Sequence, residues 1–204
     1  MPDFTCQTCT KVFSVPEATI KKFHGWQPKA CLSCKKQKGG GSAREENLTA
    51  TQVLAKYTSG PTEGVFTDGS SEPNPGPGGW GAVYVTNDTV AAEAYDYDPA
   101  TTNNRMELTA LIAGCGLVPL GKKTTLYTDS RLCVDTVNTW AKGWEAKGWK
   151  KKGGEIKNLQ LVQELYGILK KRPELTVAWI AAHSGNRWNE YADALATAYR
   201  RKEV

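Results

Sequence analysis

The chain has 204 residues, of which 40% are hydrophobic and 23% charged, a mixture typical of globular proteins rather than disordered or fibrous ones. The formal net charge of +5 is unevenly spread, because residues 1–38 hold seven lysines against two acidic residues, whereas residues 61–204 hold 17 basic and 17 acidic residues. No apolar run approaches the ~20 residues that a membrane helix needs. The first residues lack a basic segment followed by an apolar one, so we expect an intracellular protein that is neither secreted nor bound to membranes.

Composition divides the chain into three parts. Residues 1–38 contain two Cys-x-x-Cys pairs and form a candidate metal-binding module. Residues 39–62 begin with Gly-Gly-Gly-Ser and end in Ser-Gly-Pro, so we interpret them as a mostly flexible linker with one or two helical turns at 47–57. Residues 63–204 form the main domain and are numerous enough to bury a hydrophobic core.

The main domain is predicted to begin with three strands and to continue with strands that alternate with helices. The predicted strands are 65–68, 80–86, 90–95, 124–128 and 175–180. The predicted helices start at Asn103, at Arg131 and near Leu159, and the last covers about 188–201. Three consecutive strands favour an antiparallel meander, and the later strands favour parallel additions. We therefore expect an α/β fold with a mixed five-stranded sheet and helices on both faces.

The segment 76–81 matches the G-x-G-x-x-G pattern of dinucleotide-binding loops. That pattern must open a helix whose first amides hold the pyrophosphate. Here the β-like residues Val83–Val85 follow, and Pro75 and Pro77 remove two amide donors. We interpret the segment as a structural turn.

Four acidic residues lie at positions that suit metal chemistry. Asp68 and Asp129 end predicted strands, Glu107 lies in the first turns of a helix, and Asp193 lies among alanines in the last helix. Loops and strand ends at one edge of such a sheet bring distant side chains together. Clustered carboxylates repel one another unless cations neutralise them or their pKa values rise. Oxygen ligands alone favour Mg²⁺ or Mn²⁺, although each acid taken singly could be a solvated turn residue or a helix cap.

Several motifs, in this order, make residues 64–202 resemble the type 1 ribonuclease H domains. The matching segments are Thr67–Ser70 with Asn74–Gly79, Thr101–Leu108, Thr128–Ser130, His183–Gly185 and Asn189–Asp193, together with a basic stretch that contains Trp140, Trp144 and Trp149. The family's fold is the five-stranded sheet expected above. Its activity is endonucleolytic cleavage of the RNA strand of an RNA–DNA hybrid, which leaves 5′-phosphate and 3′-hydroxyl ends.

The resemblance implies a role for each acid and for one histidine. Asp68 would bridge two Mg²⁺ ions, for which Mn²⁺ could substitute. Asp193 would help to hold the ion that activates water, and Glu107 and Asp129 would hold the ion beside the leaving oxygen. His183 would assist proton transfer or product departure.

Further residues resemble the family's contacts to its substrate. These candidates are Asn74, Thr102, Asn103, Asn104, Arg131, Trp140 and Asn158. Asn74, Asn103 and Asn104 would reach base edges and sugar hydroxyls, and Trp140 would pack on a deoxyribose. Thr102 and Asn158 resemble the family's phosphate-pocket residues. Residues 139–158 hold six lysines and two glutamates, which suits contact with the DNA-strand phosphates. Two departures stand out: Arg131 replaces the usual Gln, which leaves its role open, and Ala182 replaces the usual Gly, which would reduce loop mobility.

Cys6, Cys9, Cys31 and Cys34 form two pairs that could close the tetrahedral shell of one structural Zn²⁺. Redox dithiols or disulfides are the alternatives. The segment resembles small zinc-ribbon or treble-clef modules, and so short a chain would depend on metal for its stability. Its positive charge favours nucleic-acid binding, and a protein partner is the other possibility.

The leading hypothesis is a monomeric hybrid-specific ribonuclease. The rivals are a weakly active nucleic-acid-binding adaptor whose zinc module docks a protein partner, and a fragment of a larger polymerase or retroelement protein. The complete set of acids argues against the first rival, and the self-contained chain against the second.

Overall fold

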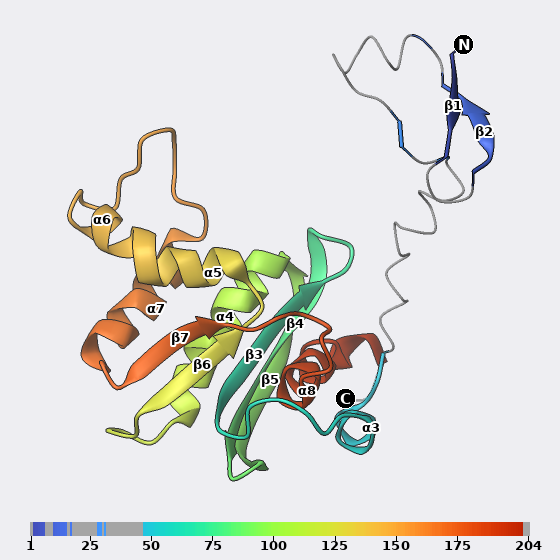
Figure 1. Ribbon diagram of the computed structural model, residues 1–204. Coiled ribbons are helices and arrows are strands. Elements are labelled where there is room, and N and C mark those ends of the chain that lie inside the picture. The colour runs from blue at the N-terminus through green and yellow to red at the C-terminus, as the bar shows by residue number, and fades with distance from the viewer. Residues whose placement is uncertain are drawn as a thin grey trace. The chain divides into compact units, whose positions relative to one another are not determined.

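A computed structural model of the protein describes residues 2–6, 10–15, 17, 28–29, 31 and 47–201 (Figure 1). The chain divides into two compact units, Met1–Glu46 and Asn47–Val204. In the first unit, β1 (Asp3–Thr5) and β2 (Val12–Ser14) form an antiparallel pair, with Phe4 opposite Phe13. Within the described residues, no helix is long and apolar enough to cross a membrane.

The second unit is built on a five-stranded sheet. Its strands are β3 (Gly64–Ser71), β4 (Gly76–Thr86), β5 (Thr89–Thr101), β6 (Thr124–Thr128) and β7 (Leu175–Trp179). The spatial order is β5-β4-β3-β6-β7. The first three strands pair antiparallel, and β6 and β7 add in parallel. The predicted mixed sheet is therefore confirmed, with β3 and β5 longer than the sequence pattern indicates.

Helices follow the strands in the predicted order. They are α3 (Ala50–Lys56), α4 (Asn103–Leu117), α5 (Arg131–Asp135), the π-helix η1 (Thr136–Trp140), α6 (Ala141–Glu145), α7 (Leu159–Lys171), α8 (Arg187–Ala196) and the 3₁₀-helix η2 (Ala198–Arg201). The helix expected to start at Arg131 thus continues to Glu145 through a π-helical turn. The last helix ends its α-helical part at Ala196, five residues before the predicted end.

The helices cover both faces of the sheet. Consecutive strand residues point to opposite sides, so apolar side chains on each face are buried under helices. Val65 belongs to a core with residues of α4 and α7, such as Leu111 and Leu165. Its neighbour Phe66 belongs to a second core with residues of α8, such as Leu195. Figure 1 shows α4 and α8 on opposite sides of β3.

The glycine-rich segment 76–81 is strand rather than turn, so the predicted turn is wrong for these residues. Its glycines instead allow α8 to approach the sheet closely. A Cβ atom on Gly81 would lie 2.6 Å from the carbonyl oxygen of Ala192, and one on Gly79 would lie 2.4 Å from that of Ala196. Without side chains at these positions the backbone of α8 rests directly on β4, and Asp193, on this helix, is held near β3.

The second half of the expected linker is folded against the second unit. Thr49 and Gln52 form a capping box at the start of α3, in which each residue's side chain accepts a hydrogen bond from the other's backbone amide. Val53 is 2% exposed and packs in the same core as Trp188 and Leu195 of α8. Residues from Asn47 onward therefore belong to the compact unit.

Candidate active site

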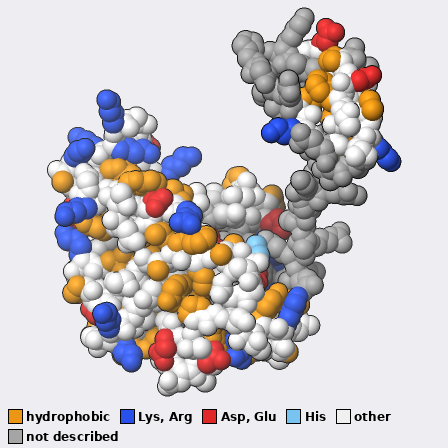
Figure 2. Space-filling model, in the orientation of Figure 1, with side chains coloured by type: hydrophobic (Ala, Val, Ile, Leu, Met, Phe, Trp, Pro, Cys, Tyr) orange, Lys and Arg blue, Asp and Glu red, His pale blue; other side chains and the backbone are white. Residues whose placement is uncertain are grey.

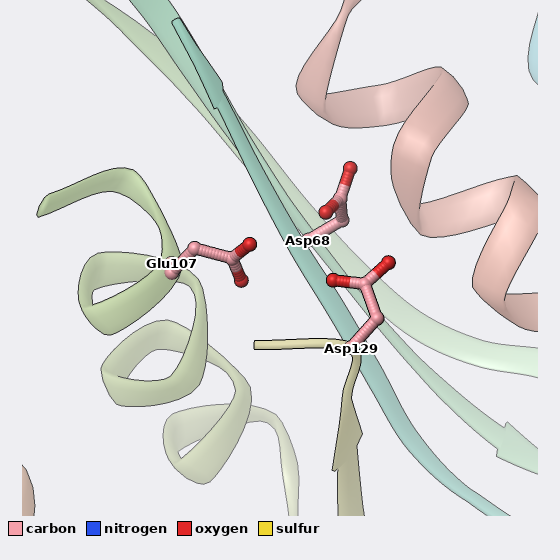
Figure 3. A group of neighbouring side chains, drawn as sticks. All are labelled: Asp68, Glu107 and Asp129. Atoms are coloured by element: carbon pink, nitrogen blue, oxygen red, sulfur yellow. The ribbon is translucent and has the colours of Figure 1, made fainter. Parts of the chain in front are cut away.

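Three carboxyl groups from distant parts of the chain meet at one edge of the sheet. Asp68 lies in β3, Glu107 in α4, and Asp129 directly after β6, and one oxygen of each lies within 4.8 Å of the other two. Figure 3 shows the carboxyl groups of these three residues facing a common space. Asp193 of α8 is a neighbour of this cluster, since its charge and a side-chain hydrogen bond both act on Asp68. The structure thus brings together the four acids that the sequence singles out.

The parallel pairing of β3 and β6 places two of these acids side by side. Thr67 pairs with Thr128, so Asp68, which lies inside β3, and Asp129, the first residue after β6, are brought next to each other at the C-terminal end of β6. Gly69 then allows α4 to approach. A Cβ atom on Gly69 would lie 2.1 Å from the amide nitrogen of Glu107, so only glycine lets this helix deliver its carboxylate to Asp68.

The surroundings of the buried acids disfavour their ionised, negatively charged forms. Burial raises the pKa of Asp68 well above its usual range, and the charges of Glu107, Asp129 and Asp193 raise it further. Burial and the charge of Asp129 likewise raise the pKa of Glu107. Because repulsion and desolvation act together, a cation between these groups would be strongly favoured. An all-oxygen donor set of this size fits Mg²⁺ or Mn²⁺.

Two polar side chains that the sequence analysis left without a role hold the acids in place. Thr128 Oγ1 donates a hydrogen bond to Glu107 Oε2 at 3.3 Å. Asn189 is 2% exposed and donates from Nδ2 to Asp129 Oδ2 at 3.4 Å. Both residues sit inside motifs that carry the resemblance, and Thr128 continues the alternation of buried residues along β6. That alternation could have identified Thr128 in advance.

His183 lies on an exposed loop near the acids. Burial raises the pKa of Asp129, and the charge of His183 opposes part of this rise. The backbone of His183 has a φ of 45°, which places it in the left-handed region that a non-glycine residue seldom adopts. The loop therefore has an uncommon backbone conformation at His183, whose charge acts on Asp129.

Arg131 stacks on an aromatic ring beside the site. Its guanidinium carbon lies 3.6 Å from the centre of the Trp179 ring. The indole nitrogen of Trp179 donates a hydrogen bond to the carbonyl oxygen of Asp129 at 3.1 Å. No sequence motif points to Trp179, whose pairing with Thr128 at the ends of β7 and β6 explains its position.

Three of the candidate substrate contacts make local hydrogen bonds at the start of α4. Asn103 Oδ1 accepts from the amide of Ser71 at 2.5 Å, and Asn74 Oδ1 accepts from the amide of Asn103 at 3.3 Å. Thr102 caps α4 by accepting from the amide of Arg105. These bonds fix the loop after β3 against α4, and any role of the three residues in substrate binding remains a prediction.

The other three candidates, Asn104, Trp140 and Asn158, line one pocket of about 170 Å³. Lys151 and Lys157 also line this pocket. The Trp140 ring is 40% exposed and lies 5.9 Å from that of Trp144, centre to centre. In Figure 2, basic side chains gather over the region where Figure 1 shows α6 and the segment that leads to α7. The pocket is thus lined by aromatic rings, side-chain amides and positive charges, which together suit the binding of a sugar–phosphate chain.

The predicted zinc ligands are only partly described. Cys9 and Cys34 lie outside the described residues. Cys6 is buried directly after β1, and its backbone closes a turn through bonds of 2.9 Å with Thr10 and Lys11. Cys31 is half-buried. The zinc site remains a prediction.

Comparisons with known proteins agree with this geometry. The family model described as RNase H matches residues 61–201, more than half of the chain. A ribonuclease H of Methylorubrum extorquens is 43% identical over 140 residues, which cover 69% of this chain and 60% of that protein. A ribonuclease H of Hyphomonas neptunium is 43% identical over 136 residues, which cover 65% of this chain and 87% of that protein.

A solved structure also resembles the second unit. The crystal structure of LC11-RNase H1 in complex with an RNA/DNA hybrid superposes with a TM-score of 0.50 at 25% identity, and the match covers 66% of this chain and 93% of that one. The matched residues 61–201 contain all four acids and His183. Because the family model matches more than half of the chain and a relative covered over 87% of its length is 43% identical, the chain belongs to the ribonuclease H family of hydrolases.

Proposed function

We propose that this protein cleaves the RNA strand of RNA–DNA hybrids by metal-dependent hydrolysis of a phosphodiester, leaving 5′-phosphate and 3′-hydroxyl ends. The observation that carries the proposal is the cluster of Asp68, Glu107 and Asp129, whose oxygens lie within 4.8 Å of one another, with Asp193 acting on Asp68. The hybrid bound in the structure of LC11-RNase H1 supports the substrate class.

The four acids would hold two divalent ions: Asp68 would be a ligand of both, Asp193 would help to hold the ion that activates water, and Glu107 and Asp129 would hold the ion that stabilises the leaving oxygen. When bound, such ions activate water and stabilise the charge that develops on the entering and departing oxygens. Thr128 and Asn189 orient two of these carboxylates through the hydrogen bonds described above. His183 would move a proton at its imidazole ring or help the product to depart.

The substrate would be recognised by shape and by the RNA 2′-hydroxyl groups rather than by sequence. Asn74, Asn103 and Asn104 would contact the groove, and Thr102, Trp140 and Asn158 the DNA strand. The guanidinium of Arg131 lies over the ring of Trp179, which is hydrogen-bonded to Asp129, so Arg131 would present its donors to the phosphate backbone.

The proposal is tested by incubating the full chain with labelled substrates. We expect Mg²⁺-dependent cleavage of an RNA–DNA hybrid, no cleavage of matched DNA duplex or single-stranded RNA, and loss of activity when EDTA is added. The products should carry 5′-phosphate ends. Tight hybrid binding without cleavage at any Mg²⁺ or Mn²⁺ concentration would instead identify the protein as an adaptor.

We further propose that Cys6, Cys9, Cys31 and Cys34 bind one structural Zn²⁺ and that this module aids nucleic-acid binding. The β1–β2 hairpin supports the proposal, since Cys6 is buried where β1 ends and its backbone forms the turn. The lysine excess of residues 1–38 supports contact with nucleic acid rather than with a protein partner.

Metal analysis of the purified chain should find one zinc, and Cys31→Ser should remove it. Cys115→Ser is the matched control, because Cys115 is buried in α4 and burial raises the pKa of its thiol to about 11, so it stays protonated. Structural zinc sites bind the ion with an apparent free energy of ~10–16 kcal/mol, so the loss of one ligand should cause a clear fall in the zinc content of the purified chain. A zinc-free wild-type chain with a Cys6–Cys31 or similar disulfide would contradict the prediction.

A further inference from the structure

The segment before β3 packs against the end of the loop that carries His183. The amide of Arg187 donates to the carbonyl oxygen of Ser59 at 2.7 Å, and Ser59 forms an isolated parallel bridge with Asn186. The half-buried ring of Tyr57 faces Gly185, where an added Cβ atom would lie 3.8 Å from the ring. We call residues 47–60 the strap.

The strap is itself firmly attached to α8. Val53 is 2% exposed in the core that contains Trp188, and the capping box at Thr49 fixes the first turn of α3. Beyond the C-terminal end of α8, Arg201 of η2 donates to Asn47 Oδ1 at 2.7 Å. The strap therefore packs along the last helix. Because it is fixed there, its contacts to residues 185–187 can restrain those residues.

The end of the His183 loop has two further anchors. Glu190 Oε1 accepts from the amide of Gly185 at 3.1 Å. Asp88, in the turn between β4 and β5, accepts from Arg187 at 2.9 Å and from the indole of Trp188 at 2.7 Å. His183 is exposed, has a φ of 45° and lies two residues before Gly185, so contacts that fix residues 185–187 also restrict the backbone at the end of its loop. The strap adds a third set of contacts to these residues.

We propose that the strap is a positioning element of the active site, in which Tyr57 and Ser59 fix residues 185–187 and so hold His183 beside the acids. The strap precedes residues 61–201, the part of the chain that matches the family model. The expected effect on kcat rests on the proposed function. The expected effect of Tyr57 on the conformation of the loop does not depend on that function.

The test compares Tyr57→Ala, Tyr57→Phe and Tyr97→Ala in the full chain. Tyr97 is 55% exposed on β5 and is a matched control for loss of a tyrosine ring. Amide hydrogen exchange of residues 181–187 and the kcat and KM for a labelled hybrid are measured. For Tyr57→Ala we expect faster exchange confined to this segment, and a kcat loss of about 5- to 50-fold with KM within about twofold, below the ~100-fold that ~1 Å of misplacement can cost. Tyr57→Phe keeps the ring and should restore both values.

Three results would overturn the proposal. Faster exchange throughout the second unit would mean that Tyr57 only stabilises the fold, and an unchanged exchange rate in 181–187 would mean that the loop does not depend on the strap. A local change in exchange with unchanged kcat would refute the role in positioning His183 for the reaction. If the wild-type chain cleaves no hybrid, the proposed function fails, but the exchange comparison still decides whether Tyr57 holds the loop.

Discussion

Replacing Asp68 by Asn should abolish hybrid cleavage while making the metal-free protein more stable. Asp68 is the acid on which the other three act, and an amide cannot bring negative charge to a shared cation. Loss of a ligand that stabilises developing charge is worth several kcal/mol, so we expect a fall in kcat of about 10³-fold or more. The measurement is the initial rate of cleavage of a labelled hybrid at saturating Mg²⁺.

Stability should change in the opposite direction. Burial and repulsion raise the pKa of Asp68 and Glu107 well above their usual range, so their ionised forms are unfavourable in the folded chain. The amide introduced by Asp68→Asn would carry no charge at any pH. The midpoint of thermal unfolding in EDTA should therefore rise by a few degrees, since ~1 kcal/mol corresponds to about 2–4 °C for a protein of this size.

The same raised pKa values set the pH dependence of the wild-type protein. Carboxyl groups of an unfolded chain titrate near pH ~4, so above that pH the folded state binds more protons than the unfolded state. The free energy of unfolding in EDTA should therefore fall as the pH rises from that value through the raised pKa values of Asp68 and Glu107. Mg²⁺ should oppose this fall, and Asp68→Asn should flatten it.

Asp96→Asn is the matched control, because Asp96 is exposed on β5 and its side chain accepts only from the neighbouring amide of Tyr97 among the hydrogen bonds described. It should leave both the rate and the pH dependence unchanged. If Asp68→Asn retained wild-type activity, the assignment of the acids as ion ligands would be wrong. If it destabilised the chain in EDTA, the repulsion inferred from burial would be wrong.

The acids were predictable because each belongs to a short local motif, and the order of these motifs is specific to the family. The glycines of β4 were not, since Gly79 and Gly81 look like turn residues until α8, more than a hundred residues later, is seen to rest on them. The local sequence pattern indicates only that glycine can adopt turn conformations. It does not show that a distant helix packs its backbone against these glycines.

The helical turns expected at 47–57 are confirmed by α3, but the packing of this segment against α8 was not predicted, for a related physical reason. Val53 is one of few apolar residues in a region that begins with a glycine–serine run, so composition favours a linker. Its burial depends on α8, whose Trp188 and Leu195 complete the same core. A short helix without a partner is marginal, and only tertiary packing makes this one stable. Stacking of Arg131 on Trp179 was likewise hidden, because it joins the ends of two strands that are 50 residues apart in the chain.

Gly69 should tolerate no side chain, even the methyl group of alanine. A Cβ atom there would lie 2.1 Å from the amide nitrogen of Glu107 and 2.3 Å from the carbonyl carbon of Met106. Both are backbone atoms in the first turns of α4, so no side-chain rotation can relieve the contact, and the helix itself must move away from β3. We expect Gly69→Ala to lower the free energy of unfolding by about 3 kcal/mol, at the upper end of overpacking effects.

Cleavage should suffer beyond what the loss of stability explains, because the displaced helix carries Glu107 away from Asp68. We expect a fall in kcat of about 100-fold in the fraction that remains folded, the size that ~1 Å of misplacement can produce. Gly116→Ala, in the same helix, is the matched control: an added Cβ meets nothing within 4 Å there, and alanine should stabilise the helix by about 0.5–1 kcal/mol. A Gly69→Ala protein with wild-type unfolding and wild-type kcat would show that α4 can withdraw without moving its carboxylate, and the close approach of helix and strand would then not be what builds the site.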